Sequence, residues 1–372
     1  MKNKIAKSIG VLSLASLMTT TAHAQLTISG YAEAGFLTGS QKGTLQAVNS
    51  KGLGGETVIT VAGKGKLSNG WDYSAYQNID SDEVTNGRDT AFTRNGPLTT
   101  RAITLSPSAN LSLFYTYDGV YGGEIARTAV PVVTERPVDL TGNSRLAEFI
   151  DVTSGGHAIG FDINNAGPKG RLSVAYNPNL DAMSDNSSDR SYSGTGQTNY
   201  VNPASGYSIG YSVNPGPVTV RAGYTKIDQK QSATAKDATS KTLGVTFAQA
   251  PFAIGAQRTV NDGGKGAFTT TNFFEDTVDT FAATFAASKE VSLGVMYSEL
   301  EKKGPGIAAN TVGAPTTKGP DLKVVQLTVA YNLGPVVISG AYEDAKNRAV
   351  ANGPTLNGND SQTAKVKVKA NF

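Results

Sequence analysis

The sequence has no cysteine, one tryptophan and only two histidines among its 372 residues. Without cysteine, a disulfide framework, thiolate catalysis and cysteine-bound zinc are excluded. His23 lies in the leader segment described below, so His157 alone would have to serve any catalytic triad or histidine–metal site. Most hydrolase and metalloenzyme chemistries are therefore disfavoured, and we expect neither a metal nor a cofactor.

Charge is also scarce and balanced. Charged residues make up 17% of the chain, against roughly 25% in an average soluble protein. Without Lys2, Lys4 and Lys7 of the leader, the 33 basic side chains fall to 30, equal to the 30 acidic ones. A nucleic-acid-binding protein needs a basic surplus to displace counterions, so we expect no nucleic-acid partner.

Residues 1–24 have the pattern of a signal peptide. Three lysines precede a short apolar core at 9–18, and Ala22, His23 and Ala24 form a small-x-small cleavage site. An uncleaved anchor is the alternative, but this core is shorter than the roughly 20 residues that span a bilayer. No later run of about 18 apolar residues follows. We expect export of a single domain, 25–372.

Strict alternation of apolar and polar residues recurs along the whole domain and predicts β-strands. In the last segment, Ala364, Val366 and Val368 alternate with lysines. Each segment is close to the 9–11 residues that a tilted strand needs to cross a membrane. The sixteen segments are 26–36, 56–67, 71–80, 99–106, 109–118, 155–164, 169–177, 205–213, 217–228, 239–248, 251–261, 277–286, 289–299, 322–332, 334–344 and 362–372.

The connections between these segments alternate in length. Short turns such as 68–70 and 214–216, rich in Asn, Gly and Pro, follow the even-numbered segments. Long polar connections follow the odd-numbered ones, at 37–55, 81–98, 119–154, 178–204, 229–238, 262–276, 300–321 and 345–361. Transmembrane barrels have short periplasmic turns and long external loops. We predict an all-β fold, a transmembrane antiparallel β-barrel of 16 strands.

Aromatic residues gather at both ends of these segments, as expected for girdles at the two membrane interfaces. The alternative is the general preference of aromatic residues for strands. The residues in question are Phe36, Tyr117, Tyr176, Tyr224, Tyr297 and Tyr342 at one end, and Trp71, Phe252, Tyr331 and Phe372 at the other.

The start QLTISGYAEAG, the sixteen-strand alternation, the long third loop and the end AKVKVKANF, closing on Phe372, together resemble the Gram-negative general-diffusion porins. The resemblance implies a homotrimer surrounded by membrane lipid and lipopolysaccharide, with the third loop folded into the lumen as a constriction. It also implies that the outer-membrane assembly machinery reads the terminal strand. The third loop lacks the Pro-Glu-Phe-Gly-Gly motif of enteric members, so their pore diameter does not carry over.

Strand parity indicates which charges face a water-filled lumen, because the face away from lipid stays polar. Five lysines of the second and last segments would form one basic wall, interrupted mainly by Glu33. Arg101 would join them only if a bulge intervenes. The alternative role of the lysine row is solubility or edge protection. The predicted lumen residues are Lys64, Lys66, Lys365, Lys367, Lys369, Arg171 and Arg221, with Glu33 and Asp118 as lumen acids.

The third loop carries more acidic than basic residues and would oppose that wall. Facing rows of charge create a transverse field that filters ions. The alternative is that each charge is merely solvated. The loop charges are Glu124, Glu135, Asp139, Glu148 and Asp151 against Arg127, Arg136 and Arg145.

The sequence therefore predicts an outer-membrane channel for passive diffusion of ions and small hydrophilic solutes. A substrate-selective channel for anions such as phosphate is one alternative, and a surface structural or adhesin barrel is a more remote one. A barrel hydrolase would need an organised base beside its nucleophile, which a single histidine hardly provides. Ca²⁺ binding through oxygen ligands of the acid-rich loops at 80–83 and 181–189 is a further alternative, although neither loop matches a known Ca²⁺-loop spacing.

Overall fold

In the part of the chain that the structure describes, the protein forms sixteen strands and one short 3₁₀-helix, η2 (Gly122–Ala126). The computed structural model describes residues 25–42, 48–83, 98–117, 119–134, 152–153, 157–167, 169–178, 205–228, 237–262, 275–302, 321–348 and 359–372. The strands are β1 (Gln25–Lys42), β2 (Val48–Lys66), β3 (Asp72–Glu83), β4 (Leu98–Ser108), β5 (Leu111–Tyr117), β6 (His157–Asn164), β7 (Arg171–Asn177), β8 (Ser205–Val213), β9 (Val218–Asp228), β10 (Ala238–Gln249), β11 (Phe252–Asp262), β12 (Glu275–Ala286), β13 (Val291–Lys302), β14 (Leu322–Asn332), β15 (Val336–Arg348) and β16 (Asn359–Asn371).

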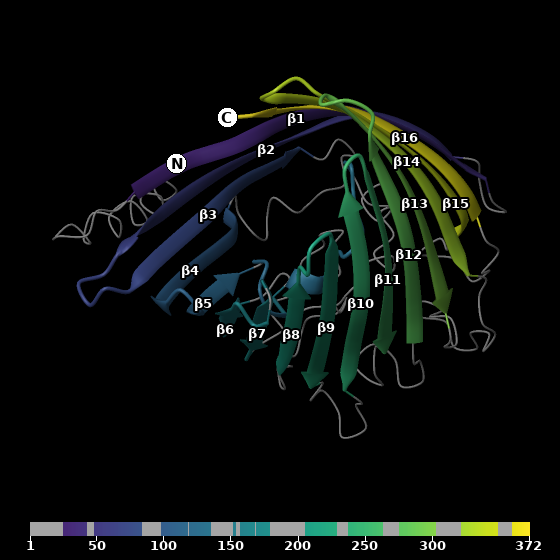
Figure 1. Ribbon diagram of the computed structural model, residues 1–372. Helices are drawn as coiled ribbons and strands as arrows, with labels where there is room; N and C mark the ends of the chain where they lie inside the picture. The colour runs from purple at the N-terminus through teal and green to yellow at the C-terminus, as the bar shows by residue number, and fades with distance from the viewer. Residues whose placement is uncertain are drawn as a thin grey trace, which may run out of the picture.

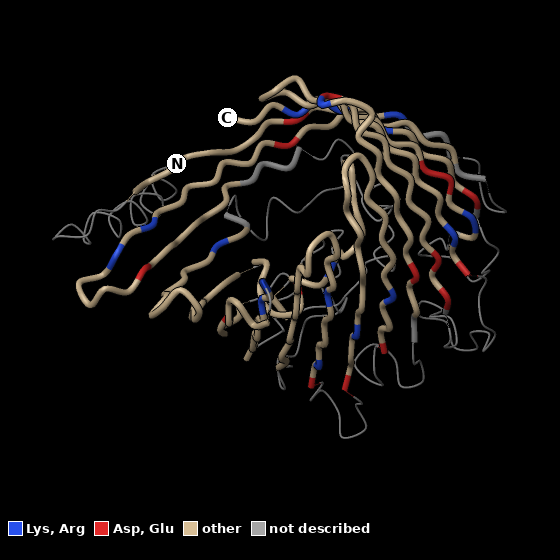
Figure 2. Tube along the Cα trace, viewed as in Figure 1, with Lys and Arg blue, Asp and Glu red and all other residues tan. Residues whose placement is uncertain are grey.

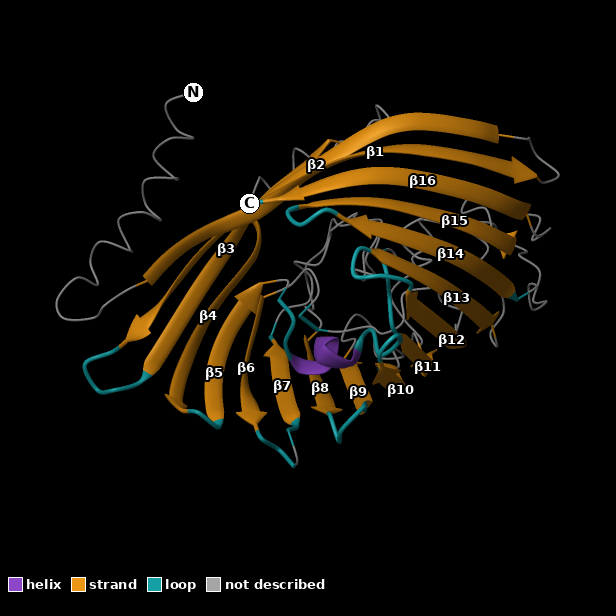
Figure 3. Cartoon of the chain, turned by 45° about the horizontal axis from the view of Figure 1, so that its top comes forward, coloured by secondary structure: helices purple, strands orange, loops and turns teal. Residues whose placement is uncertain are grey.

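Every strand pairs antiparallel with its neighbours in sequence, and β1 closes the barrel against β16 (Figures 1 and 3). The closing register sets Ala34 opposite Val368. Gly30 and Phe372 exchange two backbone hydrogen bonds of 2.9 and 3.0 Å. Closure leaves no unpaired sheet edge, which is the condition for strands to persist in lipid. The predicted sixteen-stranded barrel is confirmed.

The barrel wall is apolar on its outer face and polar on its inner face, the reverse of a soluble barrel. On the outer face, Leu243, Ile254 and Phe281 expose 57%, 56% and 54% of their surface. On the inner face, Thr242 and Gln257 of β10 and β11 are at most 5% exposed. Apolar residues on the outer face and polar residues inside fit a barrel whose exterior meets hydrocarbon.

Short turns join the strands at one end of the barrel, here called the turn end; the other end is the loop end. Gly70, Gly216 and Gly334 have φ of +84°, +69° and +82° in these turns. Glycine adopts positive φ without a Cβ clash, which is why these turns are tight. The predicted turns at 68–70 and 214–216 are therefore confirmed.

The first connection differs from its prediction. We expected a loop over 37–55, but β1 continues to Lys42 and β2 begins at Val48. The two strands stay paired out to Gln41 and Val48. Beyond the membrane both faces of a hairpin meet water, so side-chain alternation fades while backbone pairing continues. Alternation alone therefore underestimates strands that project past the bilayer.

Charged residues of the later strands gather toward the loop end (Figure 2). Arg258 lies 2.6 Å from Asp279 across β11 and β12. Lys323 lies 3.0 Å from Glu299 across β14 and β13. These pairs lie past the apolar band, so they mark where the hydrocarbon layer ends.

Candidate channel constriction

The start of the third loop lies inside the barrel, where η2 packs against the inner face of β7 and β8 (Figure 3). The Gly122 amide donates to Ser173 Oγ at 2.7 Å, and the Gly123 amide donates to Ser208 Oγ at 3.0 Å. Gly122 has φ +60°, and a Cβ there would lie 2.3 Å from Ser208 Oγ. On the facing strand, a Cβ at Gly210 would lie 2.2 Å from the Gly122 carbonyl oxygen. Only paired glycines let the loop backbone approach the wall this closely.

A second set of contacts fixes the segment that follows η2. Gln257 of β11 accepts from the Ala129 amide at 2.7 Å and donates to the Arg127 carbonyl at 2.8 Å. Val130 packs in an apolar cluster with Ala282 and Met296, on the inner face of β12 and β13. Residues 119–134 therefore follow the inner wall from β7 to β13. These residues lie inside the barrel, whereas most of the rest of the predicted third loop lies outside the described residues.

The charges of this stretch are paired within it or with the wall. Arg127 and Glu124 form an ion pair of 2.9 Å, with each side chain 12% exposed. Arg171 of β7 lies 2.7 Å from Asp162 of β6 and also donates to the Val120 carbonyl at 3.3 Å. Inner-face side chains thus hold the loop electrostatically as well as through neutral hydrogen bonds.

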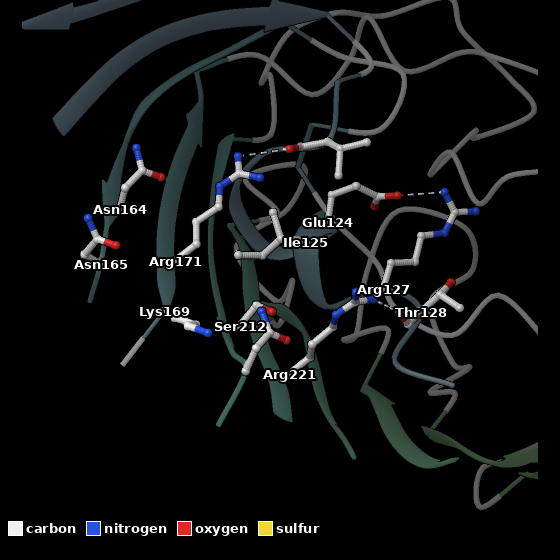
Figure 4. A pocket seen from close by; sticks show the side chains of 13 residues that line it. Glu124, Ile125, Arg127, Thr128, Asn164, Asn165, Lys169, Arg171, Ser212 and Arg221 are labelled. Atoms are coloured by element: carbon white, nitrogen blue, oxygen red, sulfur yellow. Dashed lines mark hydrogen bonds and ion pairs between the residues drawn. The ribbon is translucent and has the colours of Figure 1, made fainter. Parts of the chain in front are cut away.

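A cavity of about 790 Å³ lies between this loop segment and the turn end (Figure 4). Arg221 of β9 lines it and donates to the carbonyl of Thr128. The cavity is also lined by Arg171 of β7, by Arg127 after η2, and by Lys169 of the β6–β7 turn. Among the described residues that line the cavity, Glu124 is the only acidic one. The predicted inward direction of Arg171 and Arg221 fits their place in this lining.

The five predicted lysines do share one inner face, on β2 and β16, opposite the η2 side of the barrel (Figure 3). Lys367 lies 3.2 Å from Glu33, and Lys369 Nζ lies 3.2 Å from the ring centre of Tyr31. Lys66 pairs with Asp72 at 2.8 Å. We call the set Lys64, Lys66, Lys365, Lys367 and Lys369 the lysine wall.

Two further carboxylates belong to this face. Glu56 stands opposite Glu33 in the β1–β2 register and accepts from the Tyr31 hydroxyl at 2.7 Å. Glu343 of β15 stands opposite Thr363, two residues from Lys365. Among the side chains that the structure describes, four carboxylates thus interrupt the lysine wall, those of Glu33, Glu56, Asp72 and Glu343, rather than mainly Glu33. Alternation placed Glu56 on the lysine face, but only the strand register brings it beside Glu33.

Arg101 lies on the outer face. It stands opposite Tyr117, and its Cζ lies 4.8 Å from the centre of that ring. One register shift lies where Leu98–Arg101 of β4 faces Gln77–Ile79 of β3, and another lies between Leu105 and Ser108. The pairing from Arg101 to Leu105 is regular, so Arg101 keeps the parity of the exposed Ile103. His157 shares the outer face, with its Nδ1 2.6 Å from the Tyr115 hydroxyl.

The remaining predicted residues, Asp118, Glu135, Arg136, Asp139, Arg145, Glu148 and Asp151, lie outside the described residues. Within the described part, no group of three or more His, Asp or Glu side chains is placed to hold a metal ion. There, too, no helix has the length and apolar character needed to cross a membrane.

A closed barrel with an apolar exterior, a polar interior and a loop fixed inside defines a transmembrane channel of the porin class. The sequence profile described as "Gram-negative porin" matches residues 10–305. The chain belongs to that family, and it is an outer-membrane channel for diffusion.

Solved structures show the same fold. The outer membrane channel DcaP of Acinetobacter baumannii aligns with TM-score 0.64 and 12% identity, covering 94% of this chain and 97% of that one. An anion-selective porin from Comamonas acidovorans gives 0.62 and 13%, covering 94% and 100%. OmpT of Vibrio cholerae, in its trimer form, gives 0.59 and 8%, covering 94% and 99%. Comparison with curated protein sequences gives no match.

Proposed function

We propose that the barrel conducts ions and small hydrophilic solutes through a narrowing between the η2 segment and the lysine wall. The single observation that carries this proposal is the fixing of residues 119–134 against the inner face by Ser173, Ser208 and Gln257. A loop fixed in this way would narrow the lumen, and water-filled lumens of this class stay polar.

The lysine wall would line one side of the path, and Arg171 and Arg221 the other. Facing charges act on passing ions because low-dielectric walls concentrate the field. Support comes from the inner-face position of all seven side chains. The loop residues from 135 onward would add the acidic part of the constriction, including Glu135 and Asp139.

We further propose that three copies assemble in the outer membrane, after removal of residues 1–24. The trimer form of the similar OmpT structure supports the assembly. Lipopolysaccharide would contact the outer face at the loop end, where Arg258, Lys323 and Lys346 lie beside carboxylates. The assembly machinery would recognise β16 and Phe372.

No catalytic step is part of this proposal. His157 contacts Tyr115 and Tyr117 on the outer face, away from the cavity and the lumen. An organised nucleophile and base would have to share a site with substrate. Transport would therefore be passive.

Single-channel conductance in a planar bilayer tests the proposal. Large, ohmic steps that appear in threes, with weak ion preference, would support a trimeric general-diffusion channel. Small steps that one solute blocks at low concentration would replace it with a substrate-selective channel. The absence of any conductance from correctly folded protein would contradict both.

A further inference from the structure

The cavity beneath η2 has more positive than negative charge. Arg127 is paired with Glu124, and Arg171 is paired with Asp162. Arg221 and Lys169 have no carboxylate partner among the residues that the structure describes. Two positive charges therefore remain at one cavity that is open enough to hold a small solute.

Of these two residues, Arg221 has the environment that more strongly favours a bound anion. Its side chain is partly buried, its printed partner is the neutral carbonyl of Thr128, and its Nε atom is buried without a hydrogen-bond partner. Removing a guanidinium from water without an opposing charge is costly, and a bound anion would offset that cost. Arginine's planar set of donors suits carboxylate and phosphate oxygens.

Lys169 reaches the same cavity from the β6–β7 turn. Its φ is +57°, and that of Asn165 in the same turn is +60°. Few non-glycine residues adopt this conformation. The turn places both side chains in the lining of the cavity, where the Asn165 amide donates to Asn110 Oδ1 at 2.8 Å and Lys169 supplies the positive charge (Figure 4).

We propose that this cavity is a binding station for a small, multiply charged oxyanion, held by Arg221 and Lys169 on the turn-end side of the constriction. The inference rests on the proposed function, because the anion reaches the station through the channel. It places anion recognition beside the third loop and not on the lysine wall. Short turns lie on the periplasmic side in this class, so the station would act as the last contact before release.

Inorganic phosphate, added to the turn-end side of a bilayer at fixed KCl, probes the station. We expect a saturable reduction of the KCl current. Arg221→Gln and Lys169→Gln should each raise the half-blocking phosphate concentration on the order of tenfold, as expected for loss of one charge-assisted hydrogen bond. Succinate should block in the same way, whereas acetate, with one charge, should block more weakly.

Arg258→Gln is the matched control, because Arg258 lies on the outer face and the same charge is lost. It should leave the phosphate block unchanged. If loss of the Arg221 hydrogen bond to Thr128 prevents folding, Lys169→Gln carries the test, because Lys169 is exposed and forms no hydrogen bond or ion pair with the described part of the loop.

The proposal of a binding station would be contradicted if neither variant weakened the phosphate block, or if Arg258→Gln weakened it equally. A current that phosphate and succinate both leave unchanged would do the same while the channel itself stands. If the unmodified protein showed no conductance at all, the proposed function would be contradicted instead.

Discussion

The two charged sides of the lumen differ in how their cations are balanced. On the lysine wall, five lysines share their face with four carboxylates among the described side chains, and Lys367 pairs with Glu33 at 3.2 Å. On the η2 side, Arg221 has a carbonyl partner and Lys169 has no carboxylate partner among the described residues. The ion preference of each side therefore depends on its net charge, which the neighbouring carboxylates reduce, and not on the number of cations alone. The side with fewer cations has the less compensated charge.

Displacing the third loop from the inner wall should change conduction more than any other substitution considered. Gly122→Val would place side-chain atoms against Ser208 Oγ, at a φ that β-branched residues rarely adopt. We expect residues 119–134 to leave the wall and single-channel conductance to rise on the order of twofold, because charged pore walls and constrictions set conduction. Gly63→Val is the control, since a Cβ there meets no atom within 4 Å. Unchanged conductance in a folded Gly122→Val barrel would show that the loop does not narrow the pore.

Reversing all five lysines to glutamate should have the next largest effect. With Glu33, Glu56, Asp72 and Glu343 retained, that wall would become strongly acidic and favour cations, by up to about tenfold. The reversal potential in a KCl gradient measures the shift. An unshifted potential would show that the lysine side chains do not face the conducting path.

Ion-pair stability gives a smaller contrast within the lysine wall. The Lys367 and Glu33 side chains are 16% and 13% exposed, whereas Lys66 and Asp72 are 66% and 63% exposed. Lys367→Gln should lower the free energy of unfolding by about 1–3 kcal/mol, because Glu33 is left partly buried without that cation. Lys66→Gln should change it by less than about 1 kcal/mol. Urea unfolding in lipid vesicles compares the two, and equal losses would contradict the burial argument.

Changing the outer-face histidine should have the smallest effect. His157→Gln removes a ring that contacts Tyr115 and Tyr117 outside the lumen. We expect unchanged conductance and unchanged ion preference in the same bilayer assay. A shift in either quantity would place His157 in contact with the conducting path.

Much of the barrel could be predicted from the sequence because its determinants are local. Alternation gave the number of strands and the inward direction of Lys365 and Arg171, and glycines such as Gly70 marked the turns. The length of the first hairpin was wrong, because pairing beyond the membrane leaves no alternation. The charge balance of each side of the lumen depends on the strand register, which sets Glu56 beside Glu33. The position of η2 depends on close contacts such as that of Gly122 with Gly210. No periodicity encodes such contacts.

The most direct test removes two charges from each side of the lumen and compares reversal potentials in the same KCl gradient. One variant carries Arg221→Gln with Lys169→Gln, and the other carries Lys365→Gln with Lys369→Gln. The difference in compensation predicts that the first variant shifts the reversal potential toward cation preference by more than the second. An equal loss, or a larger loss in the lysine-wall variant, would contradict the claim that the less compensated charge lies beside the third loop.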